Sequence, residues 1–483
     1  MPINYKMTIT EKKGSQLSYA FFVFYTLAIQ AFIHPAAGTS IETTEIRKGF
    51  SATPGHVNSE FQYLLADPTG LFAFGFMRVG PTKLNLAVVH LPSSLPVWSA
   101  IPSNLANWGL STTLSFDGNL VLTDKSIHDG VLWSSNSTGG DFLVLRNTSN
   151  LQILSSSDEN SAVWQSFDHP SDTLVQGQNF TSMTSLTTPD SRYALRIIGT
   201  HIGLYMEFGG RHEINYWRHS PFGAKGAIIY GIVQPLGFFG FYNADSSKAE
   251  LLPFDSFDRG YLGLHRVTIQ NDGNLHAYFW DNNKWDLVYT AVTEPCGLPG
   301  ICGAYGLCLP GKPSCFCMVN GTDGCLQTDS GDFCSKEYND FSVVRRSGVT
   351  VEYNELMLSA RVQSLAECEK ICERNCTCWG ALFSKTTNVC YLMDYPIQTV
   401  EASGDTHQGY FKVRQQGGGG SAERHRTATA VSVIFTLVFA GFALYGGYWC
   451  WDKRRSNLLR LQLAGSSQEM TQTPFKDLRS MNT

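Results

Sequence analysis

The sequence has few charged residues: 16% of its 483 positions are Asp, Glu, Lys or Arg, against roughly 25% in an average soluble domain. Its 36 Lys and Arg nearly balance its 41 Asp and Glu, and the net charge of −5 argues against a nucleic-acid coat. Aromatic residues reach 12%. This composition excludes a disordered, collagen-like or coiled-coil chain and favours a β-rich protein of the extracellular type. The length allows for roughly three to four domains.

The sequence also lacks the motifs of common enzyme sites. It contains neither His-Glu-x-x-His nor Gly-x-Ser-x-Gly, the signatures of zinc proteases and serine hydrolases. Residues 306–312 fit Gly-x-x-x-x-Gly-Lys, but Pro313 takes the Ser/Thr position and cysteines surround the segment, which argues against nucleotide binding. The 12 histidines are scattered along the chain. We therefore expect no enzyme, no metal site and no cofactor.

Two apolar segments without charged residues indicate where the chain is located. The first, residues 14–41, follows Lys12 and Lys13 and contains a long apolar run before Pro35 and Gly38. A basic start, an apolar middle and a small-residue exit predict a signal peptide over residues 1–38, although an uncleaved anchor is an alternative.

The second charge-free segment comprises the 25 residues 427–451. At 1.5 Å per residue it can cross a hydrocarbon core of ~30 Å, so we predict a transmembrane helix over 428–451, with a buried core helix as the alternative. The basic residues 453–455 follow directly, and the positive-inside rule places them in the cytosol. The chain is thus expected in the plasma membrane as a single-pass type I protein with an extracellular N-terminal part and a short cytoplasmic tail, 452–483.

Cysteine is concentrated in one stretch: 12 of the 13 cysteines lie between Cys296 and Cys390. An even, dense set in a secreted chain predicts a disulfide framework, whereas zinc sites would need a different spacing and reduced thiols. Within this stretch, Ser364 and Glu367 form a capping box that predicts a helix beginning there. Five Asn-x-Ser/Thr sequons on the expected outer side predict N-glycosylation: Asn136, Asn147, Asn179, Asn320 and Asn375.

Residues 41–291 contain no cysteine and little helical periodicity. Short apolar runs such as 71–76 and 120–122 are separated by turn sequences, for example Asp-Gly-Asn at 117–119 and 272–274. Short strands at regular spacing with Asp-Gly turns predict all-β barrels or prisms.

Several motifs then resemble one plant family. The run 164–174, Trp-Gln-Ser-Phe-Asp-His-Pro-Ser-Asp-Thr-Leu, is similar to the signature that closes the bulb-type mannose lectin domain of plant S-domain glycoproteins and receptor kinases. Residues 296–325 resemble the EGF-like module of that family, and the cysteines of 368–390 resemble its PAN/apple module. The cytoplasmic kinase of the family is missing. The layout is therefore most similar to kinase-less PAN domain-containing membrane proteins.

The resemblance implies a mainly β protein with tandem bulb-lectin-like β-prism domains, a disulfide-rich EGF-like module, an α+β PAN/apple module and one transmembrane helix. The implied boundaries are 39–185 for the lectin domain, 186–291 for a second β-rich S-domain, 292–330 for the EGF-like module, 334–414 for the PAN domain and 415–427 for a Gly-rich stalk. By analogy with the family, the implied disulfides are Cys296–Cys308, Cys302–Cys315, Cys317–Cys325, Cys368–Cys390 and Cys372–Cys378, which leaves Cys334 and Cys376 as candidate partners for a sixth. From spacing alone, other pairings remain open.

The mannose motif of bulb lectins, Gln-x-Asp-x-Asn-x-Val-x-Tyr, points to a first candidate sugar site. Alternate residues of a strand share one face, so we expect the five named side chains to lie together on a strand. This copy keeps Asp117, Asn119 and Val121, but Ser115 and Thr123 replace the Gln and the Tyr.

A second candidate keeps four of the five motif positions, Gln270, Asp272, Asn274 and Tyr278. The alternative for both copies is that Asp-Gly-Asn only forms hairpin turns. A single mannose would bind weakly, near millimolar, or about −4 kcal/mol.

We therefore expect a plant-type cell-surface glycoprotein that recognises a mannose-like carbohydrate or a glycoprotein ligand and acts as a receptor-like or co-receptor protein without a kinase of its own. The expected partners are that ligand, a receptor kinase or a second copy of the chain, and membrane lipid around the span, but no nucleic acid. The alternative is a protein-interaction or decoy receptor whose lectin folds no longer bind sugar.

Overall fold

The computed structural model describes residues 44–455 except 56–58, 127–129, 210–211, 255–262, 312–313, 320–324, 326–332, 335–340, 405, 415–440 and 442–443. The predicted signal peptide, the Gly-rich stalk, most of the predicted span, the tail beyond residue 455 and the Asn320 sequon lie outside these residues. The chain divides into two compact units, one made of residues up to 339 with 343–413, and the other of 340–342 with 414 onward.

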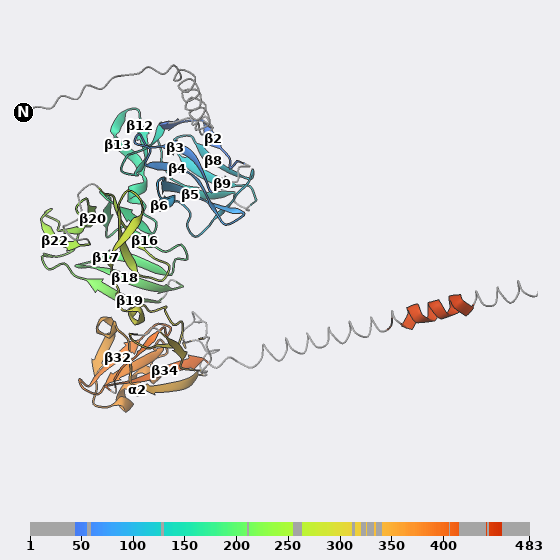
Figure 1. Ribbon diagram of the computed structural model, residues 1–483. Coiled ribbons are helices and arrows are strands. Elements are labelled where there is room, and N and C mark those ends of the chain that lie inside the picture. The colour runs from blue at the N-terminus through green and yellow to red at the C-terminus, as the bar shows by residue number, and fades with distance from the viewer. Residues whose placement is uncertain are drawn as a thin grey trace, which may run out of the picture. The chain divides into compact units, whose positions relative to one another are not determined.

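The first part of the larger unit contains three antiparallel sheets, here called the first sheet group (Figure 1, blue to cyan). One sheet has the order β1 (Glu45–Arg47), β11 (Phe142–Leu145), β12 (Leu151–Ser155), β13 (Asp158–Gln165). Another has the order β10 (Val131–Ser134), β9 (Leu120–Asp124), β8 (Thr112–Phe116), β2 (Phe50–Ala52). The third has β3 (Phe61–Ala66), β4 (Phe72–Val79), β5 (Lys83–His90) and β6 (Leu95–Ser99), with β7 (Ala106–Asn107) paired to β5.

These three sheets share one hydrophobic core. Each sheet contributes one tryptophan to it: Trp98 from β6, Trp133 from β10 and Trp164 from β13. The three rings meet edge to face, with centroids 5.8–5.9 Å apart, a favoured arrangement for aromatic pairs. The alternating strand β8 shows why the sequence folds this way, since its residues Leu114 and Phe116 are fully buried while their neighbours point outward.

A second sheet group repeats this plan between residues 173 and 290 (Figure 1, green to yellow). One sheet has the order β14 (Thr173–Val175), β23 (His265–Ile269), β24 (Leu275–Trp280), β25 (Trp285–Thr290). Another has the order β15 (Asn179–Thr181), β20 (Tyr230–Gln234), β21 (Phe238–Tyr242), β22 (Lys248–Pro253). The third has the order β16 (Ser185–Thr187), β17 (Tyr193–Ile198), β18 (His201–Phe208), β19 (His212–His219). In each group the first three strands each join a different sheet.

This repeated plan differs from the expected boundary at residue 185. Strands β14 and β15 precede that boundary and β16 spans it, yet they pair with β23, β20 and β17 of the second sheet group. The two groups are joined through the 3-10 turn η1 (Ser166–Asp168), within the signature run 164–174. The signature therefore closes the first group and opens the second.

The last part of the larger unit carries the cysteines. One sheet has the order β27 (Cys315–Cys317), β26 (Gly306–Cys308), β33 (Val400–Ala402), β29 (Val349–Thr350), and the turn η2 (Pro295–Gly297) precedes it. A five-stranded sheet has the order β28 (Phe341–Ser347), β34 (His407–Arg414), β31 (Gly380–Ser384), β32 (Val389–Met393), β30 (Leu358–Arg361), and the turn η4 (Asn354–Leu356) lies before β30.

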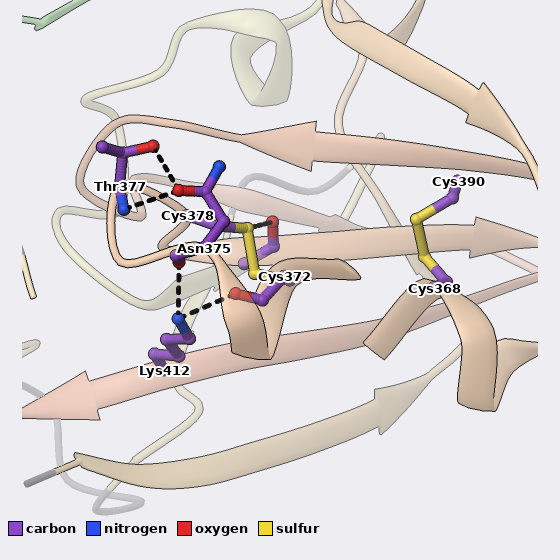
Figure 2. The surroundings of a disulfide bond; sticks show 8 residues. Cys368, Cys372, Asn375, Thr377, Cys378, Cys390 and Lys412 are labelled. Carbon is purple, nitrogen blue, oxygen red and sulfur yellow. Dashed lines mark hydrogen bonds between the residues drawn. A yellow bond between two sulfur atoms is a disulfide. The ribbon is translucent and has the colours of Figure 1, made fainter. Parts of the chain in front are cut away.

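The predicted helix is confirmed as α2 (Leu365–Arg374). The Ser364 hydroxyl caps it by accepting from the Glu367 backbone N–H at 3.3 Å, and the Glu367 carboxylate accepts from the Gln363 N–H at 2.8 Å. The buried Cys368 and Cys372 lie one turn apart on its inner face. Cys368 forms a disulfide with Cys390 on β32, and Cys372 forms one with Cys378, just before β31 (Figure 2).

Six disulfides join all twelve clustered cysteines: Cys296–Cys308, Cys302–Cys315, Cys317–Cys325, Cys334–Cys376, Cys368–Cys390 and Cys372–Cys378. Five of these are the pairs that the family resemblance implies, and Cys334–Cys376 joins its two remaining candidates. Each one closes a loop and thereby removes conformational entropy from the unfolded chain, which stabilises the fold by about 2–4 kcal/mol per bridge.

In the smaller unit, residues 444–455 are helical. Their aromatic side chains Tyr448, Trp449 and Trp451 are exposed, and the Lys453 ammonium lies 4.7 Å from the Trp449 ring centre. Among the helices that the structure describes, none has the length and apolar content needed to cross a bilayer.

Candidate carbohydrate sites and the comparisons with known proteins

The first candidate motif lies across a hairpin, not along one strand as the sequence analysis expects. Ser115 lies on β8, Asp117 stands in the turn, and Val121 and Thr123 lie on β9. The turn requires Gly118, whose φ of +83° suits glycine. The side chains nevertheless share one outward face, because Ser115 pairs directly with Val121 across the hairpin.

In this first motif the Asn119 amide is already occupied. Its Nδ2 donates to the Ser134 hydroxyl at 2.9 Å, and its Oδ1 accepts from the Ser135 hydroxyl at 2.8 Å. Asn119 therefore fastens the hairpin to strand β10 and its continuation. The carboxylate of Asp117 is exposed and remains open to a ligand.

The second candidate motif is also a hairpin, between β23 and β24. The Asp272 carboxylate accepts the Asn274 backbone N–H at 2.8 Å, which closes the turn, and Gly273 has a φ of +90°. The Asn274 side chain is 5% exposed. Its Nδ2 donates to the Val292 carbonyl at 2.8 Å and its Oδ1 accepts the Val292 N–H at 3.0 Å. Asn274 thus fastens β24 to the segment that follows β25.

The remaining polar groups of the second motif bond to one another. Gln270 Nε2 donates to the Tyr278 hydroxyl at 3.2 Å, and His276 Nδ1 lies 3.1 Å from the same hydroxyl. The Arg266 guanidinium lies 4.5 Å from the centre of the Tyr278 ring. Burial raises the pKa of Tyr278, so its phenol stays protonated at physiological pH. The structure therefore brings Gln270, Asp272 and Tyr278 to one hairpin, with Asp272 as the exposed group.

A cavity that the sequence analysis did not anticipate lies elsewhere, between the two sheet groups. Its volume is about 360 Å³, and its walls include Trp98, Trp133 and His169 from the first group and its connection. Thr187 and Ser191 come from the second group. No spacing rule points to it, because its walls come from four separate stretches of sequence.

Four of the five predicted glycosylation sites lie among the described residues, and all four asparagines, Asn136, Asn147, Asn179 and Asn375, are exposed. At Asn375 the sequon is folded into a local turn, in which Oδ1 accepts from the Thr377 N–H at 3.0 Å and from its hydroxyl at 2.9 Å (Figure 2). Asn375 Nδ2 makes no hydrogen bond within the described part of the chain.

A buried lysine holds the end of α2 beside that sequon. Lys412, on β34, is 1% exposed. Its ammonium donates to the Cys372 carbonyl at 2.9 Å and to the Asn375 carbonyl at 3.0 Å (Figure 2). A cation at a helix C-terminus satisfies unpaired carbonyls and complements the helix dipole. The role of Lys412 is therefore to position this helix.

Three protein families match the chain in sequence. The D-mannose binding lectin family matches residues 97–193, the S-locus glycoprotein domain matches 241–322, and the PAN domain matches 334–413. Together with two three-sheet groups and a disulfide-locked helix and sheet, these matches define a mainly β, lectin-type protein that carries a PAN domain.

The chain is 38% identical over 449 residues to the PAN domain-containing protein At5g03700 of Arabidopsis thaliana, and the alignment covers 90% of each protein. The chain belongs to this family of PAN domain-containing proteins, with lectin-type S-receptor kinases as further relatives. One of these, the Arabidopsis thaliana G-type lectin S-receptor-like serine/threonine-protein kinase SD2-5, is 23% identical over 465 residues, which cover 87% of this chain and 54% of the kinase. The chain thus spans about half of that kinase.

Among solved structures, the two-domain lectin Scilla campanulata agglutinin matches 45% of this chain and 95% of its own at 19% identity and a TM-score of 0.19.

Proposed function

We propose that this protein is a cell-surface recognition protein whose ectodomain binds a carbohydrate or glycoprotein ligand. The observation that supports this most directly is the match to the D-mannose binding lectin family at residues 97–193. These residues lie mainly in the first sheet group and extend into the second. We take both sheet groups to be tandem β-prisms, each with the three outward faces on which such a fold can present ligand sites. Asp117 and Asp272 are the motif side chains most open to a sugar.

The proposal places the chain at the plasma membrane as a single-pass type I protein. The predicted signal peptide, the apolar segment 428–451 and the predicted glycosylation sites support this placement. In this role the protein acts without catalysis of its own, as a receptor-like protein or co-receptor. A receptor kinase related to it, or a second copy of the chain, would carry the signal onward.

A glycan array tests the proposal. The full-length chain, with its own N-glycans removed enzymatically and the protein held in lipid nanodiscs, is applied to the array with and without methyl mannoside as competitor. We expect a signal on mannose-bearing glycans that the competitor abolishes. Absence of a competed signal on every glycan would refute carbohydrate recognition.

One observation favours a second candidate function, a protein-interaction or decoy receptor without sugar binding. The amides of Asn119 and Asn274 are both engaged with the protein's own strands, so the motif copies can be explained by folding alone. An empty glycan array together with a receptor kinase that co-purifies with the full-length chain would support this candidate.

A further inference from the structure

The cavity between the sheet groups has the size and place of a ligand site. Its volume of about 360 Å³ falls within the roughly 300–1,000 Å³ of small-molecule pockets, which often lie between domains. Two hydrogen bonds hold its surroundings in place. The Thr187 N–H donates to the carbonyl of Ser171, in the connection between the groups, at 2.9 Å. The Trp285 indole N–H of the second group donates to the Ser93 hydroxyl of the first group at 2.9 Å.

One wall of the cavity is aromatic and rigid. The Trp98 indole N–H donates to the His169 carbonyl at 2.7 Å, and the Trp98 ring packs edge to face against Trp133 with centroids 5.9 Å apart. Trp133 is half-buried, so part of its surface remains available. Indoles that are already fixed lose little conformational entropy when a ligand packs against them.

The rest of the lining is rich in hydroxyl groups. Serine and threonine contribute six of the twelve lining residues, and Asp, Glu, Lys and Arg contribute none. The hydroxyls of Ser99 and Ser103 make no hydrogen bond within the described part of the chain and can donate or accept. A phosphate or carboxylate would find no Lys or Arg here, and an amine would find no carboxylate. The lining is therefore suited to a neutral ligand with many hydroxyl groups and an apolar face.

We propose that this cavity binds a neutral hexose unit, such as the terminal sugar of a glycan, with the apolar face of the sugar against the exposed part of Trp133 and its hydroxyls bonded to Ser99 and Ser103. This inference rests on the proposed carbohydrate recognition and assigns it to a site away from both motif copies.

Ligand-observed saturation-transfer NMR with methyl α-mannoside and the full-length, deglycosylated chain in nanodiscs tests the inference. Two cavity variants are compared with the wild type. The Ser99→Ala/Ser103→Ala variant removes two hydroxyls without adding bulk, and Ser103→Trp fills the cavity from its exposed rim. The control variant, Thr82→Ala/Ser220→Ala, removes two exposed hydroxyls that belong neither to the cavity lining nor to the motif copies. Thermal unfolding confirms that each variant is folded.

We expect the serine-to-alanine variant to bind about tenfold more weakly, because each lost hydrogen bond to a sugar hydroxyl costs a factor of several. Ser103→Trp should abolish binding, and the control variant should bind as the wild type does. Wild-type affinity in both cavity variants would overturn the cavity assignment and leave carbohydrate recognition intact. If the wild type binds no hexose at all, the proposed carbohydrate recognition fails first and the cavity assignment fails with it.

Discussion

Replacing Asn274 by alanine should destabilise the protein whether or not a sugar binds nearby. The Asn274 side chain is 5% exposed and makes three hydrogen bonds, two of them with the backbone of Val292 and one with the N–H of Leu275. The substitution removes these bonds and leaves the half-buried N–H and C=O of Val292 without their partner.

The size of the effect follows from these contacts. Each hydrogen bond contributes about 1 kcal/mol net. The contact with Leu275 is local, so we count mainly the two bonds to Val292, which gives a loss of about 2 kcal/mol. For a cooperative unit of 150–250 residues, about 1 kcal/mol corresponds to roughly 2–4 °C. The melting temperature should therefore fall by roughly 4–8 °C.

Asn271→Ala is the matched control, because Asn271 stands in the same turn, is exposed and makes no side-chain hydrogen bond within the described residues. Its change should stay within about 0.5 kcal/mol. Thermal unfolding of the full-length variants, followed by circular dichroism, measures both. Equal melting temperatures for Asn274→Ala and Asn271→Ala would show that Asn274 does not fasten the strand. The same result would reopen the question of a ligand-binding role for its amide.

Three further outcomes are expected. Lys412→Met should lower the free energy of unfolding by about 2–4 kcal/mol, since two carbonyls at the end of α2 lose their donor. Lys370→Met, on the exposed face of α2, should leave the free energy of unfolding unchanged. Denaturant titration measures both variants. Burial, together with a hydrogen bond to the Glu352 carboxyl, raises the pKa of Glu401 to about 7. Because this folded-state value exceeds the unfolded one, the contribution of Glu401 to stability should be fully present below pH 4.5 and fall by roughly 1–2 kcal/mol as pH rises to 7. In melts across pH, the difference between the wild type and Glu401→Gln should show this trend. Burial, with the nearby Arg266, lowers the pKa of His90 to about 4. The contribution of the neutral His90 to stability should therefore be present above pH 6.5 and lost as pH falls toward 4. Acid titration of the His90→Gln variant should not show this loss.

Local sequence patterns predict much of this fold because the interactions that decide it are local. The capping box at Ser364 and Glu367 marks the start of α2, since both partners lie within one turn. The Asp-Gly-Asn turns mark both hairpins for the same reason. The disulfide pairs, by contrast, come from the family resemblance, because cysteine spacing alone allows many pairings. The sheets that β14–β16 join are decided by pairing with strands up to about a hundred residues further along the chain.

The candidate sites show where local reasoning ends. The motif spacing predicts that the side chains at 115–123 share a face, and they do, but across a hairpin. The hydrogen bonds of Asn119 reach Ser134 and Ser135, 15 and 16 residues further on, and become visible only when the next strand is in place. The cavity beside Trp98 and Trp133 is assembled from four stretches of chain, so no window of sequence contains it.

The parallel pairing of β26 with β33 limits how the protein can be dissected. A fragment ending soon after Cys325 would keep Cys296–Cys308 and Cys302–Cys315 yet lose β33, which would leave one side of β26 as an open edge. Exposed strand edges invite association between chains. Truncations made at this module boundary should therefore aggregate on expression, whereas fragments carried through residue 414 should remain monodisperse.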